Sequence, residues 1–431
     1  MILGDLHGRP GDASPEPTAF LDEVAARYPD AVSFASGRPA ERHFDLDAVH
    51  RYLRRFERYL ADERGYTDEE IRRTLCQYGR VKGVMHELVA RHLWQDVRVE
   101  ADPEAVVVTA GCQEAIFLVL RALRADDRDV ALAVSPTHAG FTGAARLVDM
   151  PVLPVAAGTA GVDLDELAAQ VRAARRDGLR PRVCHVMPDF ANPSGASMDL
   201  ATRQALLDLA EREDILLLED DPYGLFHSGG TKAPALKALD TRARVVYLGS
   251  FSATVLPGAR VGYVLADQPV AGGSFADRLA EIKSMVTVNT SPIAQAVVGG
   301  KLLEHGCSLE LATTGERQTY QRNLYQLVDG LHARFADDPD ITWNTPAGGF
   351  FLVMTVPFEV DDELLEYSAR EHGVLWTPMR HFYGDGGGNR QLRLSFSGVD
   401  SRGIEIGLDR LAAFLTDPAV RLGRPASLLP G

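Results

Sequence analysis

Residues 245–263 read VVYLGSFSATVLPGARVGY. An apolar run ends at Ser250, a serine-rich turn follows, and a second apolar run starts at Val261 after a Pro-Gly pair. Short apolar runs bounded by Ser, Gly and Pro predict two buried strands joined by a turn. The turn carries Ser250, Ser252 and Arg260, and hydroxyls combined with a guanidinium suit a dianionic phosphate. The stretch therefore predicts a sheet edge that can bind a phosphate group.

The sequence around this stretch alternates apolar runs with amphipathic segments. Strands are predicted at 105–111, 129–134, 182–187, 215–220, 244–250 and 261–266, and helices at 164–176 and 202–213. Strands that alternate with helices imply crossover connections. We therefore predict an α/β fold in which a mostly parallel sheet is covered by helices on both faces.

Beyond Pro292 the pattern changes to longer helical segments followed by shorter strands, which is typical of a second, smaller α/β unit. Its predicted elements are 309–335, 348–356, 364–372, 391–397 and 404–415. The first 75 residues are rich in proline and charge, so they cannot easily form a core of their own. We predict that 1–75 packs with the small domain, that 76–308 forms the large domain, and that 309–431 forms the small domain.

Polar residues follow several of these strands, and ligands of an open parallel sheet collect beyond the carboxyl ends of its strands. Gly111, Cys112 and Gln113 form a strand-to-helix turn whose amides can hold a phosphate, although a plain turn is the commoner reason for such a glycine. Asn192 lies in the turn ANPSG, and Asp220 and Tyr223 lie in LEDDPYG. For the segment LEDDPYG, a solvated acidic loop is the alternative.

His138 follows another strand, in the segment AVSPTHAGF. An imidazole at this edge can stack on a ring or move a proton near neutral pH. The alternative is an ordinary polar surface residue.

These motifs, in this order over about residues 30–416, resemble the fold-type I enzymes that use pyridoxal 5'-phosphate (PLP), in the class I/II aminotransferase family. The segments YLGSFS, LEDDPYG and LPGARVGY are most similar to the aminotransferase-like domain of MocR-type proteins. The resemblance implies PLP as the cofactor, with His138 against its ring, Asn192 and Tyr223 on its phenolic oxygen and Asp220 on its ring nitrogen. The implied phosphate ligands are Gly111, Cys112, Gln113, Ser250, Ser252 and Arg260.

Position 253 departs from the family, which has there the lysine that holds the cofactor aldehyde as an imine and moves protons. Ala253 stands in its place. An amino acid and PLP can still combine without the lysine, but turnover should stall. We interpret the chain as a Lys-to-Ala variant of an active enzyme that traps an external aldimine, and a catalytically dead ligand-binding homologue is the alternative. Lys283 is a poor substitute, since family members often have a lysine in that helix as well.

The resemblance also identifies a substrate side. Arg393 matches an arginine that pairs bidentately with the substrate α-carboxylate, and Gly37 and Arg38 would border the substrate. Tyr78 matches a tyrosine that reaches the cofactor phosphate of the neighbouring subunit. This implies a homodimer with shared active sites.

The predicted function is therefore that of an aminotransferase acting on a small-molecule α-amino acid. Ser135, His138 and Met379 depart from the family pattern around the substrate side. These departures leave open β- or γ-elimination, replacement, or amino-acid oxidation, because PLP supports all of these reactions.

Composition limits the partners. The 45 basic and 60 acidic residues give a net charge of -15, which disfavours binding to nucleic acid or to anionic membranes. No apolar run approaches the roughly 20 residues that span a bilayer, and no leader segment is evident. A cytoplasmic protein is predicted.

No metal site or disulfide framework is predicted. The cysteines at 76, 112, 184 and 307 lie far apart without a CxxC spacing. His86 and His92 are six residues apart, which on a helix turns them away from one another.

Overall fold

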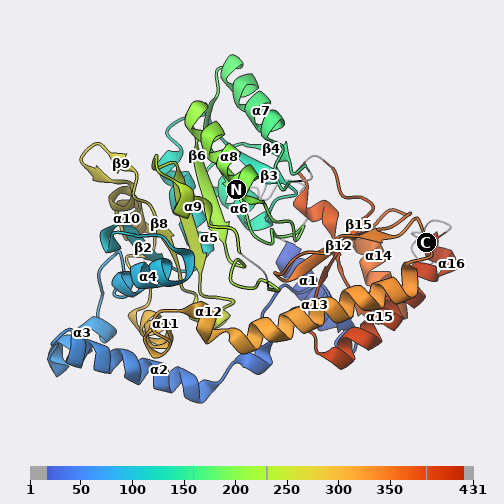
Figure 1. The fold of residues 1–431 in the computed structure, drawn as a ribbon, viewed down its shortest axis with the longest axis horizontal. Helices are drawn as coiled ribbons and strands as arrows, with labels where there is room; N and C mark the ends of the chain where they lie inside the picture. Colours follow the sequence, from blue (N-terminus) through green and yellow to red (C-terminus); the bar gives the residue numbers. More distant parts are fainter. Residues whose placement is uncertain (1–16, 159, 230–231, 385, 422–431) are drawn as a thin grey trace, which may run out of the picture.

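The computed structural model describes residues 17–421 except 159, 230–231 and 385. The ends of the predicted N-terminal segment and small domain, 1–16 and 422–431, lie outside the described residues. A large sheet occupies the centre of Figure 1, and a smaller unit lies beside it.

The large sheet has seven strands in the order β2-β8-β7-β6-β5-β3-β4. They are β2 (Val106–Thr109), β3 (Asp129–Ser135), β4 (Val152–Ala156), β5 (Arg180–Val186), β6 (Leu216–Asp221), β7 (Val245–Ser250) and β8 (Gly262–Leu265). All of the pairings are parallel except those of β8 with β7 and β2. The predicted mostly parallel sheet is confirmed.

Helices cover both faces of this sheet, as predicted. One face packs against α5 (Cys112–Leu123), α6 (Ala139–Leu147) and α10 (Phe275–Val286). The other packs against α7 (Leu164–Arg176), α8 (Leu200–Arg212), α9 (Leu236–Leu239), α4 (His86–His92) and α11 (Pro292–Glu304). Neighbouring residues of one strand, such as Leu217 and Leu218, therefore face different helix layers. This double burial explains why the strands read as continuous apolar runs rather than alternating ones.

The C-terminal unit is built on an antiparallel sheet in the order β11-β12-β15-β14. Its strands are β11 (Thr342–Trp343), β12 (Phe351–Thr355), β14 (Thr377–Pro378) and β15 (Gln391–Ser395). Its helices are α13 (Thr314–Phe335), α14 (Asp362–Tyr367), α15 (Ser401–Thr416) and α16 (Pro418–Arg421). The short helix α12 (Leu309–Ala312) instead buries Leu309 in the core that includes α4 and α11. The helices α13 and α15 run side by side in the lower right part of Figure 1.

The N-terminal segment divides between the two units. The helix α1 (Pro17–Arg27) buries Leu21 and Val24 in the core of the C-terminal unit, and β1 (Val32–Ser33) pairs with β13 (Val374–Leu375). The helices α2 (Leu46–Arg58) and α3 (Asp68–Cys76) instead lie against α11. The division of the chain at residues 75 and 308 stays a prediction.

Two helix starts show how local residues set the beginning of an element. Gly111 precedes α5 with a φ of 83°, a left-handed conformation that favours glycine. The short strands β9 (Pro269–Val270) and β10 (Gly273–Ser274) lead into α10, where the side chains of Ser274 and Asp277 form a reciprocal capping box. Both helix starts are thus fixed by local chemistry.

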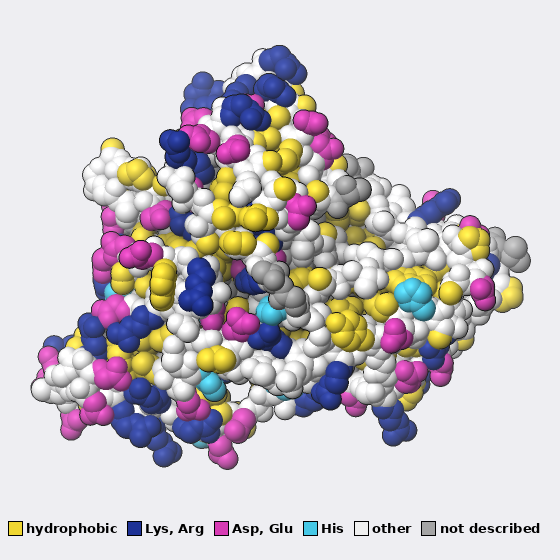
Figure 2. Space-filling view, in the orientation of Figure 1, with side chains coloured by type: hydrophobic (Ala, Val, Ile, Leu, Met, Phe, Trp, Pro, Cys, Tyr) yellow, Lys and Arg dark blue, Asp and Glu magenta, His cyan; other side chains and the backbone are white. Residues whose placement is uncertain are grey.

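The surface mixes charges of both signs. On the face drawn in Figure 2, basic side chains gather over α7 and α2 with acidic ones among them. No helix among the described residues is both long and apolar enough to cross a membrane.

Candidate active site

The predicted phosphate ligands converge where β2 and β7 end. A Cβ added at Gly111 would lie 2.6 Å from Nη2 of Arg260, so the glycine permits a close approach of that guanidinium. Oγ of Ser250 and Oγ of Ser252 are 2.7 Å apart on the adjoining turn. Two hydroxyls, a guanidinium and a helix start thus surround one small region, which is the donor set that an anion needs.

Two other residues of the predicted phosphate turn have partners within the protein. The Cys112 thiol donates to the backbone oxygen of Gly249 at 3.1 Å, and burial raises the pKa of that thiol well above its usual value. The Gln113 side chain donates to the backbone oxygen of Gly140 at 2.7 Å and is exposed. At this turn, backbone amides rather than these side chains are therefore the groups suited to an anion.

Asp220, near the end of β6, is 4% exposed. Its Oδ2 lies 3.4 Å from Nε2 of His185, whose ring stacks on Phe141 with the centroids 4.3 Å apart. Its Oδ1 is buried and has no hydrogen-bond partner among the described residues. A buried carboxylate oxygen without a partner is costly, so the site suits a ligand that brings a donor. His185 was not predicted as a site residue, although its place on β5 next to β6 could have indicated it.

Arg393, on β15, is 5% exposed, and its hydrogen-bond partners among the described residues are Asn192, Ala35 and Thr377, none of which is a carboxylate. Its Nη1 donates to Oδ1 of Asn192 at 2.6 Å, and its Nη2 donates to the backbone oxygen of Ala35 at 3.0 Å. Burial lowers its pKa to about 10, which leaves it charged at neutral pH. A buried, charged guanidinium that has no carboxylate partner in the protein is suited to bind the carboxylate of a ligand.

Aromatic rings enclose that guanidinium. Phe351 and Phe382 lie on it, with ring centroids 4.2 Å and 4.9 Å from its central carbon. Tyr223 packs edge-on against Phe351 at 5.6 Å, and burial raises the Tyr223 pKa to about 12, so its hydroxyl is protonated. A pocket of about 190 Å³ joins Arg393, Asn192, Tyr223, both phenyl rings and His138.

The rim of this pocket comes from the N-terminal segment. A Cβ added at Gly37 would lie 2.5 Å from Cζ of Phe351, so this glycine allows the chain to pass directly over the ring. Arg38 pairs with Asp22 of α1, and both side chains are partly exposed. Asp22 was not predicted, because nothing in the local pattern of α1 indicates that it faces a pocket formed by β12 and β15.

Comparisons with known proteins identify the family. The family model described as aminotransferase class I and II matches residues 41–411. The (S)-3,5-dihydroxyphenylglycine transaminase of Amycolatopsis orientalis is 51% identical over 417 residues, which cover 96% of this chain and 95% of that protein. The chain belongs to the class I and II aminotransferases.

Further relatives agree with this assignment. A probable rhizopine catabolism regulatory protein, MocR, of Rhizobium meliloti is 25% identical over 90% of this chain and 73% of that protein. The crystal structure of Pyrococcus horikoshii kynurenine aminotransferase, in complex with PMP and with kynurenine as substrate, superposes with a TM-score of 0.81 at 26% identity. The superposition covers 94% of this chain and 95% of the kynurenine aminotransferase chain. The predicted resemblance, including that to MocR-type proteins, is confirmed.

PLP is the cofactor of this aminotransferase. The residues present fit the group on two counts: Asp220 offers a buried oxygen that lacks a donor, and Gly111 with Arg260 forms a cradle that any side chain at 111 would fill. The individual residue roles stay predictions.

The turn of the aminotransferase that follows β7 contains Ala253, which packs against the core of the C-terminal unit. No lysine among the described residues lines the pocket that holds Arg393. Lys283 is fully buried elsewhere, with Nζ 2.8 Å from Oε2 of Glu114. It is therefore engaged and not placed to substitute for a lysine at 253.

Tyr78 stands apart from the other predicted residues. It is 85% exposed, and it does not line the pocket that holds Arg393. Its predicted contact with the cofactor of a neighbouring subunit stays a prediction.

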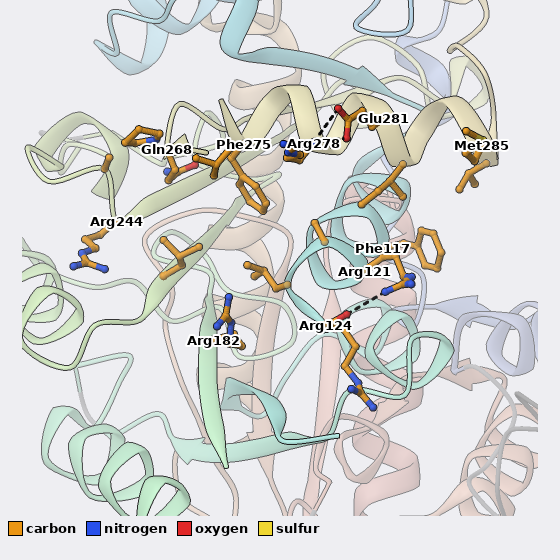
Figure 3. A pocket seen from close by; sticks show the side chains of 18 of the residues that line it. Phe117, Arg121, Arg124, Arg182, Arg244, Gln268, Phe275, Arg278, Glu281 and Met285 are labelled. Carbon is orange, nitrogen blue, oxygen red and sulfur yellow. Dashed lines mark hydrogen bonds and ion pairs between the residues drawn. The ribbon is translucent and has the colours of Figure 1, made fainter. Parts of the chain in front are cut away.

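A larger cavity lies away from this site. It measures about 980 Å³ and is lined by residues from the start of β6, by residues of α5 and α10, and by arginines such as Arg182 and Arg244 (Figure 3). None of the predicted site residues lines it. Its arginines are engaged by neighbours, as in the pair of Arg244 with Asp214 at 2.7 Å. The smaller pocket, rather than this cavity, carries the site chemistry.

Proposed function

We propose that this chain is an aminotransferase for α-amino acids with an aryl side chain, of the arylglycine class. The observation that carries the proposal is the buried, acid-free Arg393, held between the rings of Phe351 and Phe382. An α-carboxylate on this guanidinium brings the substrate side chain into an aromatic environment. The 51% identity to a (S)-3,5-dihydroxyphenylglycine transaminase supports the same substrate class.

The cofactor contacts follow from the same geometry. The amides of Gly111, Cys112 and Gln113, with Ser250, Ser252 and Arg260, would hold the phosphate of PLP, and His138 would lie against its ring. Bound there, PLP withdraws electrons from the substrate Cα.

Three side chains act on defined atoms. The Asp220 carboxylate, whose buried Oδ1 lacks a donor, would accept a hydrogen bond from the ring N–H of the cofactor and keep that proton in place. Tyr223, protonated because burial raises its pKa, would donate a hydrogen bond to the phenolic oxygen of the cofactor alongside Asn192. Arg393 orients the substrate carboxylate and so fixes which bond to Cα faces the ring.

Position 253 limits turnover. A lysine there would anchor the cofactor and carry the substrate α-proton, whereas the methyl group of Ala253 can do neither. We therefore propose that the chain with Ala253 is a Lys-to-Ala variant that binds cofactor and amino acid without converting them efficiently. Ala253 is equally compatible with the second candidate, a ligand-binding homologue with no catalytic function.

The rim of the pocket bears on the substrate. Arg38, paired with Asp22, and Gly37 would border the substrate side chain, and this pair can exchange hydrogen bonds with ring hydroxyls. β- or γ-elimination, replacement and amino-acid oxidation stay open as alternative reactions until the product is known.

We also propose a homodimer in which Tyr78 of each subunit reaches the other subunit's cofactor phosphate. The exposure of the Tyr78 ring, at 85%, is consistent with a contact outside its own subunit. A cytoplasmic location and a role in amino-acid metabolism or biosynthesis remain predictions from composition and family.

The test is a substrate panel. Ala253→Lys and the chain with Ala253 are each incubated with PLP, 2-oxoglutarate and phenylglycine, 3,5-dihydroxyphenylglycine, alanine or aspartate, and products are identified by mass. The proposal predicts that Ala253→Lys forms the arylglyoxylate from both arylglycines faster than it converts alanine or aspartate. Turnover of alanine or aspartate alone would contradict the aryl assignment, and no turnover with intact PLP binding would favour the binding protein.

A further inference from the structure

Lys283 is a buried lysine for which the proposed reaction has no direct use. Its side chain is fully buried on α10, and its Nζ donates to Oε2 of Glu114 and to Oγ1 of Thr287, each at 2.8 Å. Thr287 in turn donates to Oε1 of Glu114 at 2.6 Å. Both oxygens of the Glu114 carboxylate are therefore bound from the end of α10.

Glu114 connects this cluster to the phosphate turn. It lies in the first turn of α5, and its Oε2 also accepts a hydrogen bond from the backbone N–H of Ala110 at 2.6 Å. Ala110 directly precedes Gly111, and Oγ1 of Thr109 donates to the backbone oxygen of Gly111 at 3.0 Å. The carboxylate thus ties the residue before the turn to the helix after it.

The geometry of such a turn decides how its amides point. The first N–H groups of a helix have no partner inside the helix, and they bind an anion only if the turn aims them at it. Gly111 has a φ of 83° and lies against the Arg260 guanidinium. Glycine adopts this conformation readily but has no side chain that holds it there, so the turn depends on contacts from its surroundings, and the Glu114 carboxylate provides one.

We propose that Lys283 and Thr287 are positioning residues, which orient the Glu114 carboxylate and through it hold residues 110–112 in the conformation that binds the cofactor phosphate. The proposal rests on the assignment of residues 111–113 to the phosphate within the proposed function. It assigns a role to a lysine that touches neither substrate nor the reacting atoms.

A purely structural role is the alternative, because a buried ion pair can simply join two helices. Removal of one partner would leave an unpaired buried charge and cost stability for that reason alone. The test therefore uses the double variant Lys283→Met/Glu114→Leu, which leaves no buried charge, and the single variant Thr287→Val, which removes one hydroxyl.

The readout compares two ligands in the chain with Ala253, so that no turnover is involved. Dissociation constants are measured for PLP and for pyridoxal, which has the same ring without the phosphate. Positioning of the phosphate turn predicts that the double variant loses about tenfold in PLP affinity, the effect of one charge-assisted hydrogen bond. Pyridoxal affinity should change less than twofold, and Thr287→Val should give a smaller loss for PLP alone.

Lys82→Met is the matched control. Lys82 is also a buried lysine that pairs with α10, through Oδ1 of Asp277 at 2.7 Å, but it lies at the other end of that helix. Lys82→Met should change the affinities for PLP and for pyridoxal less than twofold. Equal losses for PLP and pyridoxal, or unchanged PLP affinity in a folded double variant, would overturn the proposal. If the double variant does not fold, Thr287→Val decides by the same comparison.

The same measurements distinguish a failure of the proposed function from a failure of the role proposed for Lys283. If the parent chain binds PLP no more tightly than pyridoxal, the phosphate assignment itself is wrong. If PLP is favoured but the variants do not reduce that preference, only the role of Lys283 is wrong.

Discussion

Replacement of Arg393 by lysine tests the carboxylate site. Arg393→Lys keeps the positive charge but removes the planar guanidinium, whose N–H groups bind a carboxylate in a fixed geometry. Three of the five N–H groups of Arg393 are used inside the protein, by Asn192, Ala35 and Thr377. Its Nε has no partner among the described residues, so at least this N–H remains for a ligand.

The magnitude follows from these remaining groups. A hydrogen bond to a charged group is worth about 1.5–3 kcal/mol, so the loss of two such bonds costs at least about 3 kcal/mol. At about 1.4 kcal/mol per tenfold change, this is on the order of a hundredfold in affinity. Two phenyl rings enclose the guanidinium, so solvent screening should reduce the effect little.

The assay compares two amines bound to the PLP-loaded chain, phenylglycine and benzylamine, which differ in the carboxylate alone. Arg393→Lys should lower the affinity for phenylglycine about a hundredfold and change the affinity for benzylamine less than threefold. Arg182→Lys, at the far cavity, is the control and should change neither. Equal losses for both amines, or full retention of phenylglycine binding, would refute the assignment of Arg393.

Three further predictions concern single residues. Asp220→Ala should weaken PLP binding at least tenfold in an equilibrium titration, because the buried carboxylate is the predicted partner of the ring nitrogen; unchanged affinity would argue against the predicted cofactor orientation. Gly37→Ala should lower stability by about 1–3 kcal/mol in urea unfolding, since the new Cβ would meet the Phe351 ring, and a neutral effect would show that the ring can move. Asp96→Asn should destabilise the protein near pH 7 but less at a pH well below 3.8. Burial opposes ionisation of Asp96, but hydrogen bonds from His92 and Ser308 outweigh this effect and lower the pKa of its carboxyl in the folded protein. Ionised Asp96 therefore stabilises the folded protein above the unfolded pKa of 3.8, and this stabilisation is lost as the pH falls through the lower, folded pKa. Equal destabilisation at both pH values would contradict an ionised Asp96.

The apolar runs predicted the large sheet well because its strands are buried on both faces. The predicted strand at 215–220 corresponds to β6 at Leu216–Asp221, and the predicted helix at 164–176 to α7 at Leu164–Arg176. The strand β4 was not predicted. It is short, contains Pro154 and lies at the edge of the sheet, where proline is tolerated and the apolar pattern is weak.

The site could be predicted only where residues follow strands in sequence. Asp220 and Ser250 lie at strand ends, so the rule for parallel sheets places them together. The contact of Lys283 with Glu114 joins residues 169 positions apart, and the pairing of Arg38 with Asp22 depends on how α1 lies against the C-terminal unit. Local periodicity carries no information on either contact, because both depend on packing between elements.

The measurement that tests the central claim most directly follows the amino nitrogen. Ala253→Lys and the chain with Ala253 are each given PLP, ¹⁵N-labelled 3,5-dihydroxyphenylglycine and an unlabelled 2-oxo acid, and the label is located by mass spectrometry. The account predicts that only Ala253→Lys moves ¹⁵N into the amino acid formed from the 2-oxo acid. Release of the label as ammonium would contradict amino transfer, and equal transfer by both forms would contradict the role assigned to position 253.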